Sequence, residues 1–325
     1  MDDACVLAMR QLYNSAQRGN AERVQALLAV LPPCELFTIH KALTAAVLND
    51  HASVVAAFAA QGAPTWQASF RGLLSSAACN DSVRVAAVLV AAKADANGHT
   101  TEPPLCTAAS KGHLSCVSLL LAMKACVHGA RWTGIPLHHA AEHGHADVVK
   151  CLLRAKADQD RLDFFDRTPV YCAAVGMHEP ALRMLLDAHA DVNPPTPDHI
   201  PLFGAASYPR LPSVFQLLLG ARADVNATMF YGNATLSTAI GKECPDTVVK
   251  LLLRAKADVN AATNMRRITA LHNAAIHGRR TTARLLLCAK ADVRAETVAG
   301  CTAAMLARQN KHFELADYLD ANAGL

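Results

Sequence analysis

Residues 135–145 read Ile-Pro-Leu-His-His-Ala-Ala-Glu-His-Gly-His, and related stretches recur along the chain. One begins at Thr168 as Thr-Pro-Val-Tyr-Cys-Ala-Ala, and another begins at Thr269 as Thr-Ala-Leu-His-Asn-Ala-Ala-Ile-His-Gly. Downstream of each stretch lies a leucine cluster, as at Leu251-Leu252-Leu253. Self-similarity at a fixed period is the sequence signature of a repeat protein, whose units stack on their neighbours.

A second element, Lys-Ala-Asp or a close variant, follows each leucine cluster and returns every 31 to 34 residues. Val-Asn often comes directly after it, as at Val259-Asn260. The first residues of the seven copies are Lys93, Lys124, Lys156, His189, Arg222, Lys256 and Lys290. The two elements together define one repeating unit over most of the chain.

This arrangement resembles the ankyrin repeat, which has a 33-residue period and a Thr-Pro-Leu-His-x-Ala core. The resemblance implies an all-α solenoid of about nine to ten helix-turn-helix repeats with short β-hairpin loops, in a single domain spanning 1–325. We expect a partial N-terminal cap at about 1–36, repeats at about 37–64, 65–97, 98–128, 129–160, 161–193, 194–226, 227–260 and 261–294, and a C-terminal cap repeat at 295–325.

The residue types suit that unit physically. Threonine can cap a helix, and proline is tolerated in the first turn because its missing N–H has no intrahelical partner there. The pair Ala140-Ala141 gives a thin helix face, and Val148-Val149 with Leu152-Leu153 form an apolar stripe at i, i+3, i+4 spacing. One helix pair cannot bury this stripe alone, so neighbouring pairs must stack.

Two departures from the family pattern carry predictions. Around Tyr208-Pro209-Arg210-Leu211-Pro212 the sixth full copy has one extra residue and two prolines, so we expect a shortened or kinked helix pair.

Where the family has glycine after the second helix, this chain has the seven residues Lys93 to Lys290 given above. The resemblance implies left-handed backbone there, at a cost of about 1 kcal/mol per residue. These side chains would form a row that either binds acidic ligands or only neutralises helix ends beside the Asp two residues later.

Composition excludes several classes of protein. Hydrophobic residues make up 52% and charged residues 18%, which is too apolar for a disordered chain. No apolar stretch reaches the ~18 residues that span a bilayer, and the acidic start resembles no secretory signal. Eleven Cys without a CxxC pair favour a reducing compartment, and a net charge of +4 does not by itself indicate nucleic-acid binding. We expect an intracellular, cytoplasmic monomer, with the nucleus as the alternative compartment.

The chain lacks the common catalytic signatures: no phosphate-cradling Gly-rich loop, no GxSxG elbow and no HExxH are present. Most histidines occupy repeat positions. His139 and His143 lie four residues apart and could bind zinc together with His145, but no Cys or carboxylate stands at a matching offset. We therefore predict no catalytic residues, no metal and no cofactor.

Aromatic residues concentrate in the loops between copies, which project in ankyrin folds as fingers toward the concave side. Such loops with nearby arginines have the composition of a protein-binding hot spot, although each finger could instead pack its aromatic residue on the next, with Phe164 and Phe165 placing one ring in and one out. The predicted partner-binding residues are Trp66, Phe70, Arg131, Trp132, His139, Glu142, His143, Phe164, Phe165, Phe230, Tyr231 and Arg266.

The function that this resemblance implies is non-catalytic: a module or scaffold that binds a partner protein on its concave face through fingers and first helices. Two alternatives stay open. The chain could be an adaptor that brings a substrate to a ubiquitin ligase or a kinase. It could also be a weak binder of acidic ligands, phosphoinositide or nucleic acid, through the row of repeat-end cations.

Overall fold

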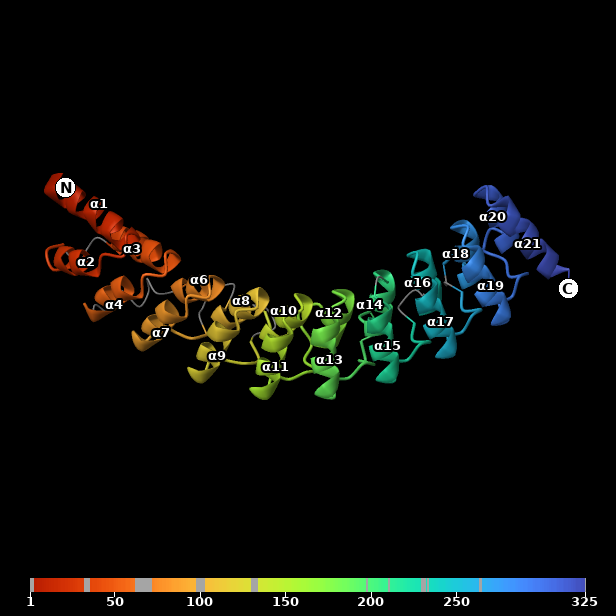
Figure 1. The fold of residues 1–325 in the computed structure, drawn as a ribbon, viewed down its shortest axis with the longest axis horizontal. Coiled ribbons are helices and arrows are strands. Elements are labelled where there is room, and N and C mark those ends of the chain that lie inside the picture. Colours follow the sequence, from red (N-terminus) through yellow and green to blue (C-terminus); the bar gives the residue numbers. More distant parts are fainter. Residues whose placement is uncertain are drawn as a thin grey trace. The chain divides into compact units, whose positions relative to one another are not determined.

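The computed structural model describes residues 3–31, 36–61, 72–97, 103–129, 134–196, 198–209, 211–228, 232, 234–262 and 265–324. Over these residues the chain forms 20 α-helices and no strand, and the helices follow one another as antiparallel pairs (Figure 1). One isolated antiparallel bridge joins Thr228 and Ala234. The predicted all-α repeat fold is confirmed.

Contacts divide the chain into two compact units, Met1–Asp158 and Gln159–Leu325. In a repeat protein each copy contacts only its neighbours, so the units consist of successive helix pairs. The first unit contains α1 (Asp3–Gln17) with α2 (Ala21–Leu28), α3 (Leu36–Leu48) with α4 (Ala52–Ala60), α6 (Leu73–Cys79) with α7 (Val83–Ala91), α8 (Pro104–Lys111) with α9 (Leu114–Ala122), and α10 (Pro136–Glu142) with α11 (Ala146–Arg154).

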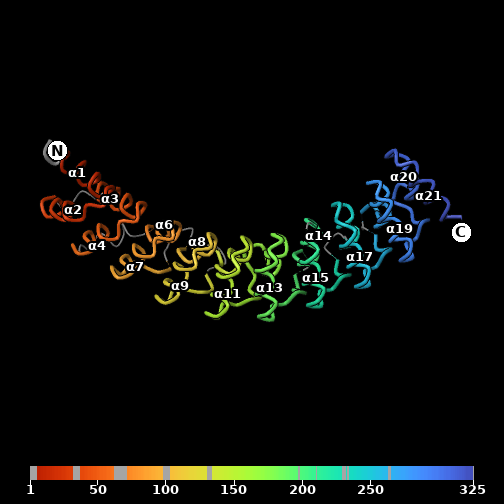
Figure 2. The backbone as a smooth tube through the Cα atoms, in the orientation of Figure 1, coloured from red at the N-terminus to blue at the C-terminus, as the bar shows by residue number. Residues whose placement is uncertain are grey.

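The second unit repeats the same pairing, as the backbone trace shows (Figure 2). It contains α12 (Pro169–Val175) with α13 (Glu179–Asp187), α14 (Pro201–Ser207) with α15 (Pro212–Gly220), α16 (Thr235–Gly241) with α17 (Asp246–Arg254), α18 (Ala270–Ile276) with α19 (Arg280–Cys288), and α20 (Ala303–Gln309) with α21 (Phe313–Ala323). The repeat boundaries and the single domain given above stay predictions.

The core of each unit is built from the small and aliphatic positions of the repeat. Ala140 and Ala141 are buried in α10, and Val148, Val149 and Leu152 are buried in α11. Full burial of a leucine side chain contributes about 2 kcal/mol, and the same positions are filled in each pair. The apolar stripe expected from the sequence therefore faces the interior.

Helix ends follow local sequence rules. Thr269 accepts the backbone N–H of His272 in a capping box, and Thr168 accepts the backbone N–H of Tyr171. Gly112 ends α8 with φ 77°, in the left-handed region that glycine adopts at low cost.

The prediction of a shortened or kinked sixth copy is wrong. Helices α14 and α15 have seven and nine residues, as α12 and α13 do. Pro212 lies in the first turn of α15, where no intrahelical hydrogen bond is lost. The extra residue is present, because residues 208–211 join this pair where 176–178 join the preceding one.

The seven residues that replace glycine after the second helices do have left-handed backbone, with φ between 61° and 67°. Asparagines join these turns from copy to copy in the second unit. Asn226 donates through Nδ2 to the carbonyl oxygen of Lys256 at 3.2 Å and accepts the N–H of Asp258 at 2.8 Å. Asn193 and Asn260 make the same two bonds to the copies that follow them. The turns that carry Arg222, Lys256 and Lys290 are therefore hydrogen-bonded to their neighbours.

Among the helices that the structure describes, none combines the length and the hydrophobicity needed to cross a bilayer.

Candidate functional site

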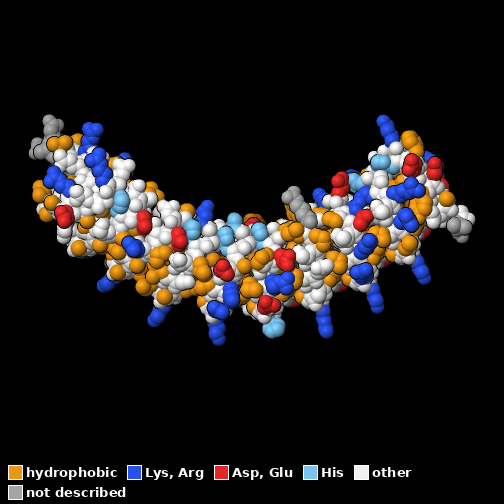
Figure 3. All heavy atoms as spheres, in the orientation of Figure 1, with side chains coloured by type: hydrophobic (Ala, Val, Ile, Leu, Met, Phe, Trp, Pro, Cys, Tyr) orange, Lys and Arg blue, Asp and Glu red, His pale blue; other side chains and the backbone are white. Residues whose placement is uncertain are grey.

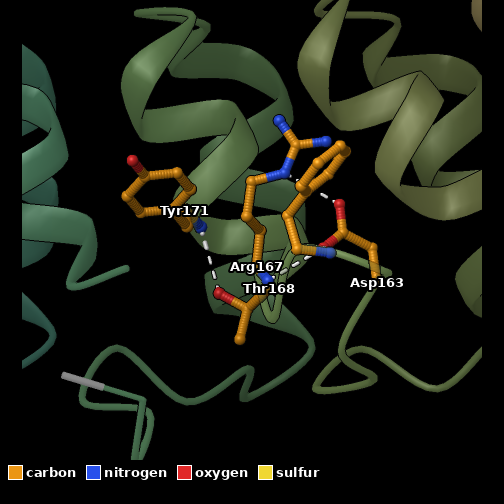
Figure 4. Close-up of polar contacts among 5 residues, drawn as sticks. Asp163, Arg167, Thr168 and Tyr171 are labelled. Atoms are coloured by element: carbon orange, nitrogen blue, oxygen red, sulfur yellow. Dashed lines mark hydrogen bonds and ion pairs between the residues drawn. The ribbon is translucent and has the colours of Figure 1, made fainter. Parts of the chain in front are cut away.

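The turn at residues 163–167 is a finger whose geometry depends on one carboxylate (Figure 4). Asp163 is 8% exposed, and its Oδ1 accepts the backbone N–H groups of Phe165 and Arg167, each at 2.9 Å. Its Oδ2 accepts Nε of Arg167 at 2.8 Å, and its own N–H donates to the carbonyl oxygen of Arg167 at 3.1 Å. Charge-assisted bonds of this kind are short and strong, so the turn is held in one conformation before any partner binds.

Two phenylalanine rings project from this turn into solvent. Phe164 is 52% exposed and Phe165 is 60% exposed, and their rings meet edge to face at 5.2 Å between centroids. The guanidinium of Arg167 lies 5.2 Å from the centre of the Phe165 ring. The alternative of one ring in and one ring out is wrong, because Asp163 takes the inward position of the turn and leaves both rings exposed.

A second exposed finger contains Arg266 and its neighbours Met265 and Arg267. Arg266 and Arg267 are exposed, Arg267 has left-handed backbone, and Met265 is 75% exposed. The N–H of Val298 donates to the carbonyl oxygen of Arg266 at 3.1 Å, which joins this finger to the next. Neighbouring fingers therefore touch through their backbones here, while the side chain of Met265 stays exposed.

All twelve predicted partner-binding residues stay predictions, and half of them lie outside the described residues. These six are Trp66, Phe70, Arg131, Trp132, Phe230 and Tyr231.

Three of the predicted contact residues lie at α10: His139 and Glu142 are within the helix, and His143 follows its last residue. His139 is half-buried, whereas Glu142 and His143 are exposed. Nδ1 of His143 lies 2.9 Å from the carbonyl oxygen of His139, and the His143 ring stacks on that of His145. In the part of the chain that the structure describes, no three His, Cys, Asp or Glu side chains are arranged to hold a metal ion.

Histidines of the Gly-His turns are structural. Nε2 of His145 lies 2.9 Å from the carbonyl oxygen of Ser110 in the preceding copy, and His312 makes the same contact with Ile276 at 3.1 Å. At the equivalent position of α19 stands Arg279, which instead pairs with Asp246 at 2.7 Å. Asn273 also bonds to the preceding copy: its Nδ2 donates to the Ser237 carbonyl oxygen at 2.9 Å. These residues position the repeats.

Sequence reasoning missed a group of cations on α17 and α19. Lys250 and Arg254 are exposed on α17, and Arg280 and Arg284 are exposed on α19. A signal for them was present, because residues 242–294 contain eleven Lys and Arg against four Asp and Glu. The net charge of the whole chain is only +4, so the total charge does not reveal this local excess of basic residues.

Stacked helix pairs with projecting turns define a repeat protein of the solenoid class. A model of the ankyrin-repeat family, covering three copies, matches residues 74–163, 124–196, 202–297 and 236–324. The chain belongs to the ankyrin-repeat family.

Solved structures and curated proteins resemble it in part. The ankyrin repeat domain of Bcl-3, a member of the IkappaB family, aligns with a TM-score of 0.55 at 26% identity over 66% of this chain and 98% of that one. The human ASB11 ankyrin repeat domain aligns with a TM-score of 0.53 at 23% identity over 76% of this chain and 98% of that one, which shows the fold alone.

Two plant proteins share sequence with the chain. A probable E3 ubiquitin-protein ligase, XBOS33 of Oryza sativa subsp. japonica, is 36% identical over 135 residues, which is 40% of this chain and 25% of that protein. The E3 ubiquitin-protein ligase XBAT33 of Arabidopsis thaliana is 38% identical over 85 residues, 26% of this chain and 17% of that protein. The matched region thus spans a quarter or less of these relatives.

Proposed function

We propose that this chain is a non-catalytic module that binds a partner protein through its finger turns and the adjoining first helices. Ankyrin repeats imply a protein-interaction module, and the observation that carries the proposal for this chain is the exposed Phe164–Phe165 pair on a preorganised turn. Exposed rings of this size are unfavourable in water unless a partner covers them.

The energetics favour these rings as an anchor. Burying one phenylalanine side chain contributes about 2–3 kcal/mol, and aromatic anchors dominate most interfaces. Because Asp163 already fixes the turn, little conformational entropy is lost on binding. His139, Glu142, His143 and Arg266 are proposed as further contacts, along with the predicted residues outside the described ranges.

The test is quantitative crosslinking of the wild-type chain and of a Phe164→Ala/Phe165→Ala variant in extracts of the source cells. A matched control is Phe313→Ala, since Phe313 is 61% exposed but begins the second helix α21. Partners that bind through the finger will be depleted by the double variant and kept by the control. Identical partner sets and crosslinking yields for all three proteins would refute the finger proposal.

A second candidate function is a substrate adaptor in ubiquitin transfer, which the names of the two plant relatives favour. The chain would hold the protein that becomes modified, and the ligase activity would reside elsewhere. The test is the ubiquitination of a partner captured by the finger, in cells with and without the chain. Unchanged ubiquitination of that partner in both cell populations would refute this role. A kinase adaptor, a monomeric state and a cytoplasmic location stay predictions.

A further inference from the structure

Positive charge gathers in the helix pairs α16–α17 and α18–α19. Residues 242–294 carry eleven basic against four acidic residues, a net +7, so the rest of the chain, with 20 against 23, carries −3. Figure 3 shows several Lys and Arg side chains over α17 and α19. A local excess of this size attracts anions over about a Debye length, far more strongly than the total charge suggests.

The cations share one face because equivalent positions of neighbouring repeats lie side by side. Lys250 of α17 and Arg284 of α19 are 34 residues apart at the same helix position, and packed helices lie roughly 8–10 Å from each other. Lys256 and Lys290 stand at the left-handed turns that end these two helices. The outer face of α17 and α19 thus presents Lys250, Arg254, Lys256, Arg280, Arg284 and Lys290, all exposed.

A hollow of about 380 Å³ opens beside these cations, lined by Arg280, Thr281 and Arg284 of α19 and by Tyr318 of α21. Arg280 and Arg284 lie one helical turn apart, so their guanidinium groups can reach the same ligand. The guanidinium of Arg280 lies over the Tyr318 ring at 5.8 Å, which restricts its position.

Most nearby carboxylates are already engaged. Asp246 accepts from both Arg279 and Thr282, and Asp317 and Asp320 pair with Arg308. Glu314 lies 3.4 Å from Arg280 and is itself well exposed to solvent.

Two further acidic residues, Asp258 and Asp292, each accept a backbone N–H through Oδ1. No ion pair of Arg284 or Lys250 occurs within the described ranges.

We propose that this hollow binds the phosphate group of a phosphorylated segment of a partner protein, with the lysines of α17 and α19 attracting the acidic residues around it. Two guanidinium groups one turn apart fit the oxygens of a phosphate dianion, and the hydroxyl of Tyr318 can add a further bond. This site is on the second helices, away from the fingers, and does not depend on the finger proposal.

Other phosphate-bearing ligands fit this face less well. No large hydrophobic side chain is exposed on α17 or α19 to enter a lipid surface. Tyr318, the aromatic ring that lines the hollow, is half-buried under Arg280, which limits its stacking on a nucleic-acid base. Lipid vesicles and a nucleic acid are therefore used as comparison ligands in the experiment.

The experiment is fluorescence anisotropy of the full chain with a short labelled peptide of Gly, Asp and one central phosphoserine. The same peptide without phosphate, a single-stranded RNA oligonucleotide, and vesicles containing phosphatidylserine are the comparison arms. We expect the phosphopeptide to bind about tenfold more tightly than the unphosphorylated peptide, as two charge-assisted bonds imply. Arg280→Gln/Arg284→Gln should remove this difference.

Two single variants sharpen the test. Glu314→Gln should tighten phosphopeptide binding, because it removes the carboxylate that competes for Arg280. Arg183→Gln should leave binding unchanged, since Arg183 has the position in α13 that Arg284 has in α19 but pairs with Glu179 at 2.9 Å.

Circular dichroism of each variant shows whether it is folded. Equal affinity for both peptides, equal loss in Arg183→Gln, or tighter binding of RNA or vesicles than of the phosphopeptide would each overturn the proposal.

Discussion

The imidazole of His145 lies against Gly112, the residue that ends helix α8 in the preceding copy. A Cβ on Gly112 would stand 2.5 Å from Nδ1 of that ring, so the close approach requires glycine as much as the φ of 77° does. Through Nε2 the same ring contacts the carbonyl oxygen of Ser110. The glycine of one copy and the histidine of the next therefore act together across each boundary of this kind, as in the pairs Gly19 with His51 and Gly278 with His312.

Gly112→Ala is expected to lower the free energy of unfolding by about 2 kcal/mol. About half comes from the left-handed backbone, and about half from displacing the His145 ring from its hydrogen bond. The control is Gly300→Ala, because Gly300 has φ 70° but no atom within 4 Å of an added Cβ, so only the backbone cost of about 1 kcal/mol applies. Urea denaturation measures both, and equal losses would show that the ring contact contributes nothing.

Asn226→Ala should weaken the boundary between the second and third copies of the second unit. The variant loses the bond from Nδ2 to Lys256 and the bond from the Asp258 N–H to Oδ1, each of which contributes about 0.5–1 kcal/mol at an exposed site. Hydrogen exchange of the Asp258 amide should accelerate. In the control Asn322→Ala, only a bond within α21 to Tyr318 is lost, so exchange at Asp258 should be unaffected.

Lys256→Gly is expected to raise stability by about 1 kcal/mol, although it removes a charge and a side chain. Lys256 has φ 64°, and glycine adopts this conformation without a steric cost. The matched variant Lys250→Gly, in the middle of α17, should lower stability by about the same amount because glycine disfavours a helix interior. Thermal melts of the two proteins should shift in opposite directions, and a shift in the same direction would contradict this account.

The stability of the second unit should fall as the pH drops below about 6.5, in part because of His272. Burial lowers the pKa of this side chain despite its bond to the Cys301 carbonyl oxygen. The unfolded chain then binds a proton at higher pH than the folded chain. Stability is therefore full above the ordinary pKa of 6.5 and declines as the pH falls towards the lowered folded value.

The measurement for His272 is the slope of unfolding free energy against pH in the wild type and in His272→Gln. The wild-type slope should exceed that of the variant by up to about 1.4 kcal/mol per pH unit between the two pKa values. Parallel slopes would show that His272 does not contribute.

Local rules made the repeat architecture predictable. Thr269 caps its helix by hydrogen bonds within four residues, and Pro136 stands in a first turn where its missing N–H costs nothing. The left-handed turn at Lys256 followed from the family resemblance and was confirmed. The prediction of a shortened or kinked sixth copy was wrong, because a proline disrupts a helix only when it lies inside it. Pro212 lies in the first turn of its helix.

The candidate sites were only partly predictable, for a different reason. The finger residues Phe164 and Phe165 were predicted as contacts from the aromatic content of the loops, but the exposure of both rings depends on the position of Asp163, which is buried in the turn. The hollow beside Arg284 was not found, because Arg280, Arg284 and Tyr318 become neighbours only when α19 packs beside α21.

The sequence by itself determined the period, the helix pairs and their ends, because hydrophobic spacing, caps and left-handed turns act over a few residues. The tertiary structure alone decided which side chains meet across copies: His145 on Gly112, Asn226 on Lys256, and the arginines of α19 beside the tyrosine of α21. Such contacts join residues about 30 to 40 positions apart, and their geometry arises from the stacking of whole helix pairs.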